Sequence, residues 1–336
     1  MKMTIAAALG AASLVCPAVS AQAEETTLIF ATATPPMAPS NREFYKPLAD
    51  KLNEAGKGVL KIDFRGDTSI ATMNNVLDRV LNDVAQIGWT LHSIYGAKFK
   101  LTSVSFLPFS AEDSTAGAVA LWRLYRTGML DADYVETVPL VMNLQAQSRL
   151  HFSKTPKTFT DFSGLKVVAS GKMYSDSVVR LGGAPVTVTI ADMYEALNRH
   201  TVDAIMMGWG GVGSYKLYEV SSYHVELPLG ASSSMIFMGR KKYEALPAAV
   251  RKVIDDNTGE ATSRALGEFT DQDGAKTRDQ VKAMSGQAVV FPTPDQYKTM
   301  EAKLAPITEE WIKETPNGAA ILAAWKKLFA EAKMGH

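Results

Sequence analysis

The chain has 336 residues, 46% of them hydrophobic, and its 35 lysine and arginine residues balance its 35 aspartate and glutamate residues. This neutral composition gives no electrostatic reason to expect nucleic acid or an anionic membrane surface as a partner. A chain of this length and hydrophobic content can bury a large core, and the length predicts two domains.

The first 23 residues have the composition of a secretory signal peptide. Lys2 supplies a positive start, the run from Ile5 to Val15 is almost wholly apolar, and Ala21–Ala23 resembles a cleavage site. A membrane anchor is the alternative, but this run is shorter than the roughly 18 residues that a spanning helix needs. The only cysteine, Cys16, lies in this segment, so a mature chain starting at Glu24 has no thiol chemistry. We therefore expect export to the periplasm.

The first part of the mature chain alternates strand-like and helix-like segments. In chain order these are a strand over 27–31, a helix over 41–55, a strand over 59–64, a helix over 70–82 and a strand over 84–89. This alternation predicts a β-α-β-α-β unit, which is typical of α/β layers around a mainly parallel sheet.

A helix over 113–126 and a long extended run over 138–153 follow, and the extended run is long enough to pass between two domains. The alternation then restarts with a strand over 165–169, a helix over 173–181, a strand over 185–188, a helix over 190–200 and a strand over 203–208. The remaining elements are a strand over 234–239, an amphipathic segment over 248–284 and helices over 294–314 and 319–332. Because no repeat or low-complexity linker separates these parts, we expect two α/β lobes joined by crossing strands.

The common catalytic and metal-binding motifs do not occur in this sequence. Its five histidines lack the spacing of zinc ligands, and it has neither a Gly-x-Ser-x-Gly elbow nor a Walker glycine loop. We therefore expect no metal, no cofactor and no enzymatic activity.

One stretch, GWGGVG over 208–213, does match the Gly-x-Gly-x-x-Gly pattern of dinucleotide sites, and Glu226 lies within reach of the acidic position. The bulky Trp209 stands between the first two glycines, and export removes the protein from the cytoplasmic dinucleotide pool. We therefore expect no dinucleotide at this site.

Several side chains follow predicted strand ends, where open α/β sheets place their ligand crevices. Trp89, Phe109 and Trp209 are at such positions, although packing in the core is the alternative for each of them. Arg149 interrupts an extended segment of small and apolar residues. A guanidinium fork at a strand edge is well suited to holding a carboxylate, and a plain surface charge is the alternative.

Motifs along nearly the whole mature chain resemble those of the solute-binding proteins of tripartite ATP-independent periplasmic (TRAP) transporters. The most specific run, from Gly164 to Val220, contains GLKVVAS, GGAPVTV, MYEAL, TVDAIMM and LYEV in the family's order. FATATPP and FLPF before it and YEALP after it extend the match. The resemblance implies a two-lobed α/β fold like that of type II periplasmic binding proteins, with a long helix bracing both lobes and a solute held between them. It also implies a membrane permease as partner.

Proteins of this family mostly hold organic acids through two arginines of the second lobe. Arg149 occupies the position of the first, but Val168 stands where the second is expected, and Ile205–Met207 replace the family's Gln-Glu-Asn. We therefore expect a monocarboxylate with an apolar or aromatic body, held by Arg149. Lys172 or Arg180 supplying the missing guanidinium from elsewhere is the alternative.

The predicted function is that of a monomeric periplasmic receptor that binds a small organic solute and delivers it to permease subunits. A receptor for a non-carboxylate solute, a protein that presents its ligand to a membrane sensor, and a secreted enzyme are the alternatives. The predicted lobes comprise 24–146 with 235–275 and 147–234 with 276–300, followed by C-terminal helices over 301–336. The predicted ligand-binding residues are Arg149, Trp89, Thr90, His92, Val168, Met207 and Trp209.

Overall fold

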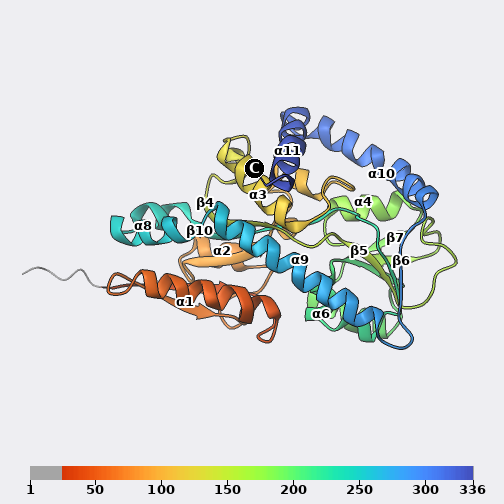
Figure 1. Ribbon diagram of the computed structural model, residues 1–336, viewed down its shortest axis with the longest axis horizontal. Helices are drawn as coiled ribbons and strands as arrows, with labels where there is room; N and C mark the ends of the chain where they lie inside the picture. Colours follow the sequence, from red (N-terminus) through yellow and green to blue (C-terminus); the bar gives the residue numbers. More distant parts are fainter. Residues whose placement is uncertain (1–24, 336) are drawn as a thin grey trace, which may run out of the picture.

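Two separate β-sheets, each covered by helices, form the computed structural model, which describes residues 25–335 (Figure 1). The predicted signal peptide, 1–23, lies outside the described residues. Each sheet buries its apolar faces under helices, as the alternating sequence pattern predicts. We call the first sheet and its helices lobe I, and the second sheet and its helices lobe II.

The sheet of lobe I has five strands in the order β2-β1-β3-β10-β4. The strands are β1 (Thr26–Thr32), β2 (Leu60–Arg65), β3 (Ile87–Leu91), β4 (Thr137–Leu144) and β10 (Ser233–Gly239). Strand β1 is parallel to β2 and β3, whereas β10 returns late in the sequence and pairs antiparallel with β3 and β4. The helices that contact these strands are α1 (Lys46–Ala55), α2 (Val76–Leu81), α3 (Ser114–Arg126) and α7 (Arg240–Ala245).

The sheet of lobe II has six strands in the order β11-β9-β5-β8-β6-β7. The strands are β5 (Arg149–Phe152), β6 (Lys166–Val168), β7 (Ala184–Val186), β8 (Ala204–Met207), β9 (Tyr223–Val225) and β11 (Ala288–Val290). Strand β5 is antiparallel to both neighbours, and its register sets Arg149 opposite Met207. The helices of this lobe are α4 (Lys172–Arg180), α5 (Met193–Asn198) and α6 (Trp209–Ser214).

The chain passes between the sheets three times, along the long stretch from β10 to β11 and through two short segments, residues 145–148 after β4 and residues 226–232 before β10. The two short segments are hydrogen-bonded to each other, because Gln145 N donates to Ser232 O at 2.9 Å and Ser148 N donates to Gly230 O at 2.8 Å. The long helix α9 (Glu260–Lys282) packs against α3 and β4 of lobe I and against α6 of lobe II (Figure 1). This arrangement confirms the two-lobed fold with a bracing helix.

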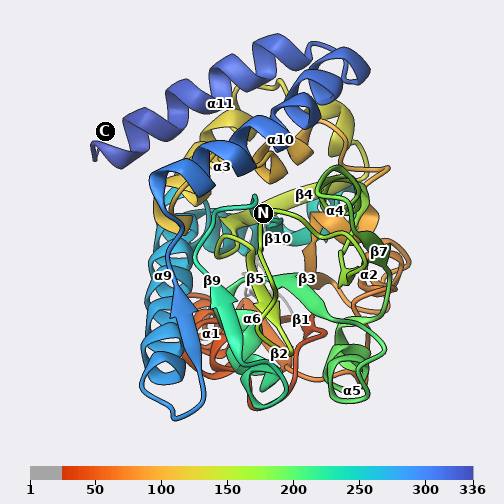
Figure 2. The same cartoon turned by 90° about the vertical axis from the view of Figure 1, so that its right-hand side faces the viewer.

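The last two helices lie together over one side of the molecule (Figure 2). Helix α10 (Pro294–Glu314) begins with a capping box in which Thr293 Oγ1 accepts from Gln296 N, and it contacts α4 of lobe II. Helix α11 (Gly318–Lys333) packs on α3 of lobe I. The C-terminal helices therefore contact both lobes.

Some predicted elements differ from the structure in their bounds. The helix expected over 70–82 begins only at Val76, because Thr72 N donates to Asn75 Oδ1 at 2.7 Å and forms a local turn before it. The strand expected over 84–89 is shifted to Ile87–Leu91, since Asp83 adopts a positive φ of 60° and ends the preceding helix in a turn. The short elements β9, β11 and α7 were not predicted.

Candidate functional site

Arg149 is the first residue of β5 and directly follows the crossing at 145–148. Its Nε donates to Glu226 Oε2 at 3.1 Å, and the side chains of Arg149 and Glu226 are 17% and 6% exposed. The terminal nitrogen Nη1 is buried and has no hydrogen-bond partner among the described residues. The guanidinium is therefore held on one edge by the protein, and one of its strong donors lacks an acceptor.

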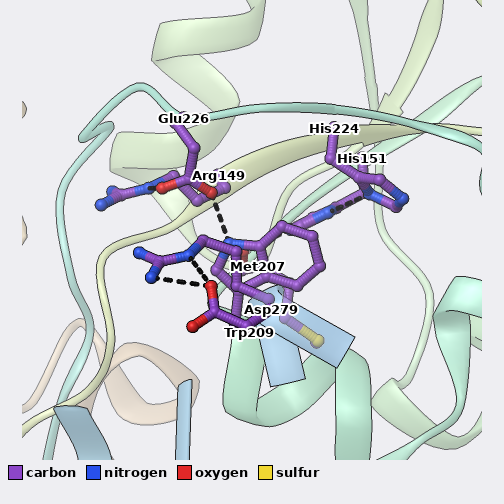
Figure 3. A network of polar contacts seen from close by, with 8 residues as sticks. Arg149, His151, Met207, Trp209, His224, Glu226 and Asp279 are labelled. Atoms are coloured by element: carbon purple, nitrogen blue, oxygen red, sulfur yellow. Dashed lines mark hydrogen bonds and ion pairs between the residues drawn. The ribbon is translucent and has the colours of Figure 1, made fainter. Parts of the chain in front are cut away.

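Glu226 links this arginine to the aromatic ring of Trp209, as Figure 3 shows. The second carboxylate oxygen, Oε1, accepts from Trp209 Nε1 at 2.5 Å. Trp209 begins α6, and its side chain lies edge-on to His151 with ring centroids 4.8 Å apart. Arg149, Glu226 and Trp209 thus form one connected polar group in lobe II, which we call the Arg149 cluster.

Two buried histidines, His151 and His224, pack against the ring of Trp209. The Nδ1 atoms of His151 and His224 are 2.8 Å apart, and His151 Nε2 is 3.0 Å from Met207 O (Figure 3). Because a carbonyl oxygen only accepts, His151 donates from Nε2 to Met207 O. Burial lowers the pKa of His151 to about 3 and also lowers the pKa of His224. The two rings pack against the indole of Trp209 and support it.

Further buried polar atoms without a partner among the described residues lie on two strands of lobe I and in the crossing before Arg149. They are Trp89 Nε1 and Thr90 Oγ1 on β3, Asn143 Oδ1 on β4, and both amide atoms of Gln147 in the crossing. Strands β3 and β4 lie on either side of β10, where Thr90 and Met142 are both opposite Met235. The unpartnered atoms of these strands therefore belong to one sheet. An unsatisfied buried polar group costs about 1 to 3 kcal/mol, so each of these atoms is a point where another molecule can supply a partner.

The structure places His92 in the core of lobe I. It is fully buried, its Nδ1 is 2.8 Å from Ser233 Oγ, and its Nε2 is 3.1 Å from Tyr134 OH. Burial lowers its pKa to about 3, and its ring lies edge-on to Phe99 at 4.6 Å. Both ring nitrogens are therefore used within the lobe, unlike the indole nitrogen of Trp89, whose ring packs against Tyr45 at 5.6 Å.

Val168, the last residue of β6, is 1% exposed and belongs to an apolar cluster that includes Trp209. Met207 is half-buried and packs against the same cluster. Lys172 is paired with Asp176 at 2.6 Å, and Arg180 is paired with Glu310. Neither cation joins the Arg149 cluster, so the position of Val168 remains apolar.

The glycines of GWGGVG allow close packing of α6. A Cβ on Gly208 would lie 2.6 Å from Ala146 O, in the crossing between the lobes, and one on Gly213 would lie 2.7 Å from Thr277 Oγ1 of α9. Helix α6 has only six residues. Contacts with the crossing and with α9 therefore account for these glycines without a dinucleotide.

Two cavities of the described chain lie away from the Arg149 cluster. One, of about 330 Å³, is enclosed by residues 107–110 and the helices α10 and α11, and the other, of about 270 Å³, lies beside Ser153 and His200. Within residues 25–335 no three His, Cys, Asp or Glu side chains are grouped as metal ligands. No helix in that range is long and apolar enough to cross a membrane.

Sequence reasoning considered Glu226 only as the acidic residue of a dinucleotide site, and it did not identify Asn143, Gln147 or the His151–His224 pair. Glu226 lies 77 residues from Arg149 along the chain, so nothing local in the sequence signals the pair. Asn143 and Gln147 lie inside the predicted extended run over 138–153, where a polar residue in an apolar strand was the available signal.

Comparisons with known proteins agree with this architecture. The family model DctP, for bacterial extracellular solute-binding proteins of family 7, matches residues 30–315. The chain is also 27% identical over 301 residues to the outer membrane transporter protein TsaT of Comamonas testosteroni, covering 88% of each chain.

Two similar solved structures have the same fold. One is a TRAP solute-binding protein from Rhodoferax ferrireducens T118 in complex with copurified benzoate. It has a TM-score of 0.84 at 23% identity, and the match covers 92% of this chain and 99% of that protein. A marine metagenome TRAP solute-binding protein specific for aromatic acid ligands, in complex with 3-hydroxybenzoate, has a TM-score of 0.86 at the same 23% identity and the same coverage. Because the family model spans most of its length, the chain belongs to the DctP family of bacterial extracellular solute-binding proteins, as its resemblance to TRAP solute receptors predicts.

Proposed function

We propose that this protein is the periplasmic receptor of a TRAP transporter and binds a small monocarboxylate with an apolar or aromatic body between its lobes. The receptor delivers the solute to membrane permease subunits and performs no chemistry on it. Arg149 is the charged anchor of the solute, and Trp89, Thr90, Val168, Met207 and Trp209 surround it. His92 is left out of this set because both of its ring nitrogens bond within lobe I.

The observation that carries this proposal is the buried Nη1 of Arg149, which has no acceptor among the described residues. Hydrogen bonds to a charged group contribute about 1.5 to 3 kcal/mol, and a buried charged donor without a partner is costly. A solute carboxylate satisfies this donor directly. The unpartnered amide of Gln147, two residues earlier, can bond a second polar atom of the solute.

The apolar body follows from the residues that replace polar ones. Val168 and Trp209 share one apolar cluster, and Met207 packs against it. A second carboxylate or several hydroxyls would be desolvated there without enough partners, which is unfavourable. Methionine adapts its shape to a ring, and tryptophan offers it a flat face. Two structures of similar fold hold benzoate and 3-hydroxybenzoate, which are acids of this class.

The hinge of this receptor is formed by the two crossings at 145–148 and 226–232. Gly274 of α9 lies where the helix passes the first crossing, since a Cβ there would be 3.7 Å from Ala146 Cβ and 3.8 Å from Trp209 Cβ. This contact is close to the boundary that we propose within α9, between residues 275 and 276. Lobe I then comprises 24–146 with 235–275, and lobe II comprises 147–234 with 276–300.

The proposal is tested by native mass spectrometry of the protein purified from the periplasm, followed by calorimetry on ligand-free protein. We expect a copurified monoacid, or tighter binding of benzoate and 3-hydroxybenzoate than of succinate and glucuronate. Small-angle scattering should give a smaller radius of gyration with ligand than without. Tighter binding of succinate or glucuronate, or recovery of a chemically altered ligand, would contradict the proposal.

A further inference from the structure

The guanidinium that we propose as the solute anchor already has an anionic neighbour inside the protein. Glu226 accepts from Arg149 Nε through Oε2 at 3.1 Å and from Trp209 Nε1 through Oε1 at 2.5 Å (Figure 3). A carboxyl group that accepts N–H bonds through both oxygens acts as a carboxylate. Arg149 and Glu226 therefore form a pair without net charge, although the site is meant to receive an anion.

Glu226 is fixed in this position by contacts on three sides. Its backbone N–H donates to Val290 O of β11 at 2.8 Å. Trp209, which holds Oε1, is 4% exposed and packs against the rings of His151 and His224, with ring centroids 4.8 and 5.0 Å away. The Glu226 side chain itself is 6% exposed. The carboxylate therefore stays beside Arg149 when a solute binds.

We propose that Glu226 is a specificity-determining residue that makes the site selective for solutes with a single negative charge. This inference rests on the proposed function, because it names the charge class of solute that the same site takes. Glu226 occupies the Nε side of the guanidinium and leaves Nη1 for one solute oxygen. A monoanion is bonded directly to the guanidinium, with Glu226 on the far side of that group.

A solute with two carboxylates lacks a second cation in this site. No lysine or arginine of the described residues is fully buried, and Val168 stands in the apolar cluster next to Trp209. The second carboxylate is then desolvated near Glu226, and the repulsion between like charges is strong where water is excluded. The site therefore discriminates by charge, beyond any discrimination by size.

Calorimetry with two ligands of one shape tests this selectivity. Terephthalate is a dianion, and its monomethyl ester is a monoanion of similar size. We expect the wild-type protein to bind the ester at least about tenfold more tightly, which corresponds to about 1.4 kcal/mol. In Glu226→Gln the ester should bind at least as tightly as in the wild type, and the ratio should fall to about threefold or less.

Two variants separate a charge effect from a structural one. Trp209→Phe removes the donor to Glu226 but keeps its charge, so both ligands should weaken by similar factors and the ratio should stay. Glu219→Gln alters an exposed carboxylate of the same lobe, which accepts from Tyr194 OH at 3.1 Å, and should change neither affinity. A role of Glu226 in positioning alone predicts that Glu226→Gln weakens both ligands equally.

The inference is wrong if the wild-type ratio is near one, or if Glu226→Gln leaves the ratio unchanged. If Glu226→Gln does not fold, a wild-type ratio near one still overturns the inference. If no benzoate derivative binds while acids of another class do, the proposed solute class fails, and this inference fails with it. If the ester binds but the ratio is near one, only the role of Glu226 is overturned.

Discussion

Both lobes contain a run of buried polar side chains, and the two runs end differently. In lobe I, His92 contacts Ser233 through one ring nitrogen and Tyr134 through the other. Tyr134 OH is 3.0 Å from Thr102 Oγ1, and Thr102 donates to Asp133 through its backbone N–H and its hydroxyl. Burial raises the pKa of Asp133, and these donors oppose that shift. The run in lobe I is thus satisfied within the protein.

In lobe II the run from His224 and His151 through Trp209 and Glu226 ends at Arg149, whose Nη1 has no partner in the described chain. The residue types are similar in the two lobes, since each run contains histidine, an aromatic side chain and a carboxylate. A fully satisfied buried network stabilises a unique core, whereas an unsatisfied charged donor is costly until another molecule completes it. The difference therefore separates a structural network from a binding one.

The largest expected effect comes from removing the unsatisfied end of the lobe II network. The double variant Arg149→Met with Glu226→Gln deletes both charges together, so no unpaired buried charge remains to unfold the protein. We expect benzoate affinity to fall by at least about a hundredfold, or about 2.8 kcal/mol, because the charged donor is gone. Isothermal titration calorimetry measures the affinity, and circular dichroism verifies the fold.

The matched control is Arg180→Met, which removes an arginine of the same lobe that pairs with Glu310 of α10. Its affinity for benzoate should equal that of the wild type. Equal affinities of the double variant and the wild type would show that Arg149 is not the anchor.

The sequence predicted most of the fold because the apolar alternation and the family-like motifs agree over nearly the whole chain. The elements that it missed are the short ones. Strands β9 and β11 have three residues each, too few for a period to appear, and they form a parallel pair by contact across 65 residues. The first half of the helix predicted over 70–82 does not form, because the Asn75 side chain accepts a hydrogen bond from Thr72 N and stabilises a turn there. Hydrophobic periodicity does not detect this competition between a side chain and the helical backbone.

The candidate site was less accessible to sequence reasoning. Arg149 was proposed from its place in an extended apolar segment and from the family motif, whereas its partner Glu226 depends on the pairing of β5 with β9, which a single sequence does not reveal. His92 was assigned to the cleft because it follows Trp89 and Thr90 at a strand end. In the structure a turn of 3₁₀-helix begins at His92 and directs its ring to Tyr134 and Phe99 inside lobe I.

The second prediction concerns the satisfied network of lobe I. His92→Phe keeps a ring of similar size but removes the bonds to Ser233 Oγ and Tyr134 OH. We expect the free energy of unfolding at pH 7 to fall by about 2 kcal/mol, about 1 for each bond lost. Benzoate affinity should remain within about twofold of the wild type. Urea unfolding measures the free energy of unfolding, and calorimetry measures the affinity. A large loss of affinity without a loss of stability would show that His92 contacts the solute.

The third prediction uses pH to separate the same variant from the wild type. The pKa of His92 is lowered from 6.5 to about 3 in the folded protein, so below pH 6.5 the unfolded chain binds a proton that the folded chain does not. Stability due to this group is present above pH 6.5 and is lost as the pH falls, by about 1.4 kcal/mol per unit. Between pH 7 and pH 5 the advantage of the wild type over His92→Phe should shrink by about 2 kcal/mol. A gap between the wild type and His92→Phe that stays constant with pH would contradict the burial argument.

The smallest expected effect tests the close contact between α6 and residues 145–148, the crossing that precedes Arg149. Gly208 has an ordinary φ of −79°, so alanine is allowed by the backbone there, but its Cβ would lie 2.6 Å from Ala146 O. The chain must then move α6 away from the crossing, and overpacking of this kind costs about 1 to 3 kcal/mol. Because α6 begins with Trp209, the shift also displaces the indole that holds Glu226, and we expect Gly208→Ala to weaken benzoate binding by about three- to tenfold, up to about 1.4 kcal/mol.

Gly96→Ala is the control, since its Cβ would meet only Ser93 O at 3.6 Å and no effect is expected. If Gly208→Ala lowers stability but leaves the affinity unchanged, the contact of α6 with the crossing is structural and does not position the Arg149 cluster.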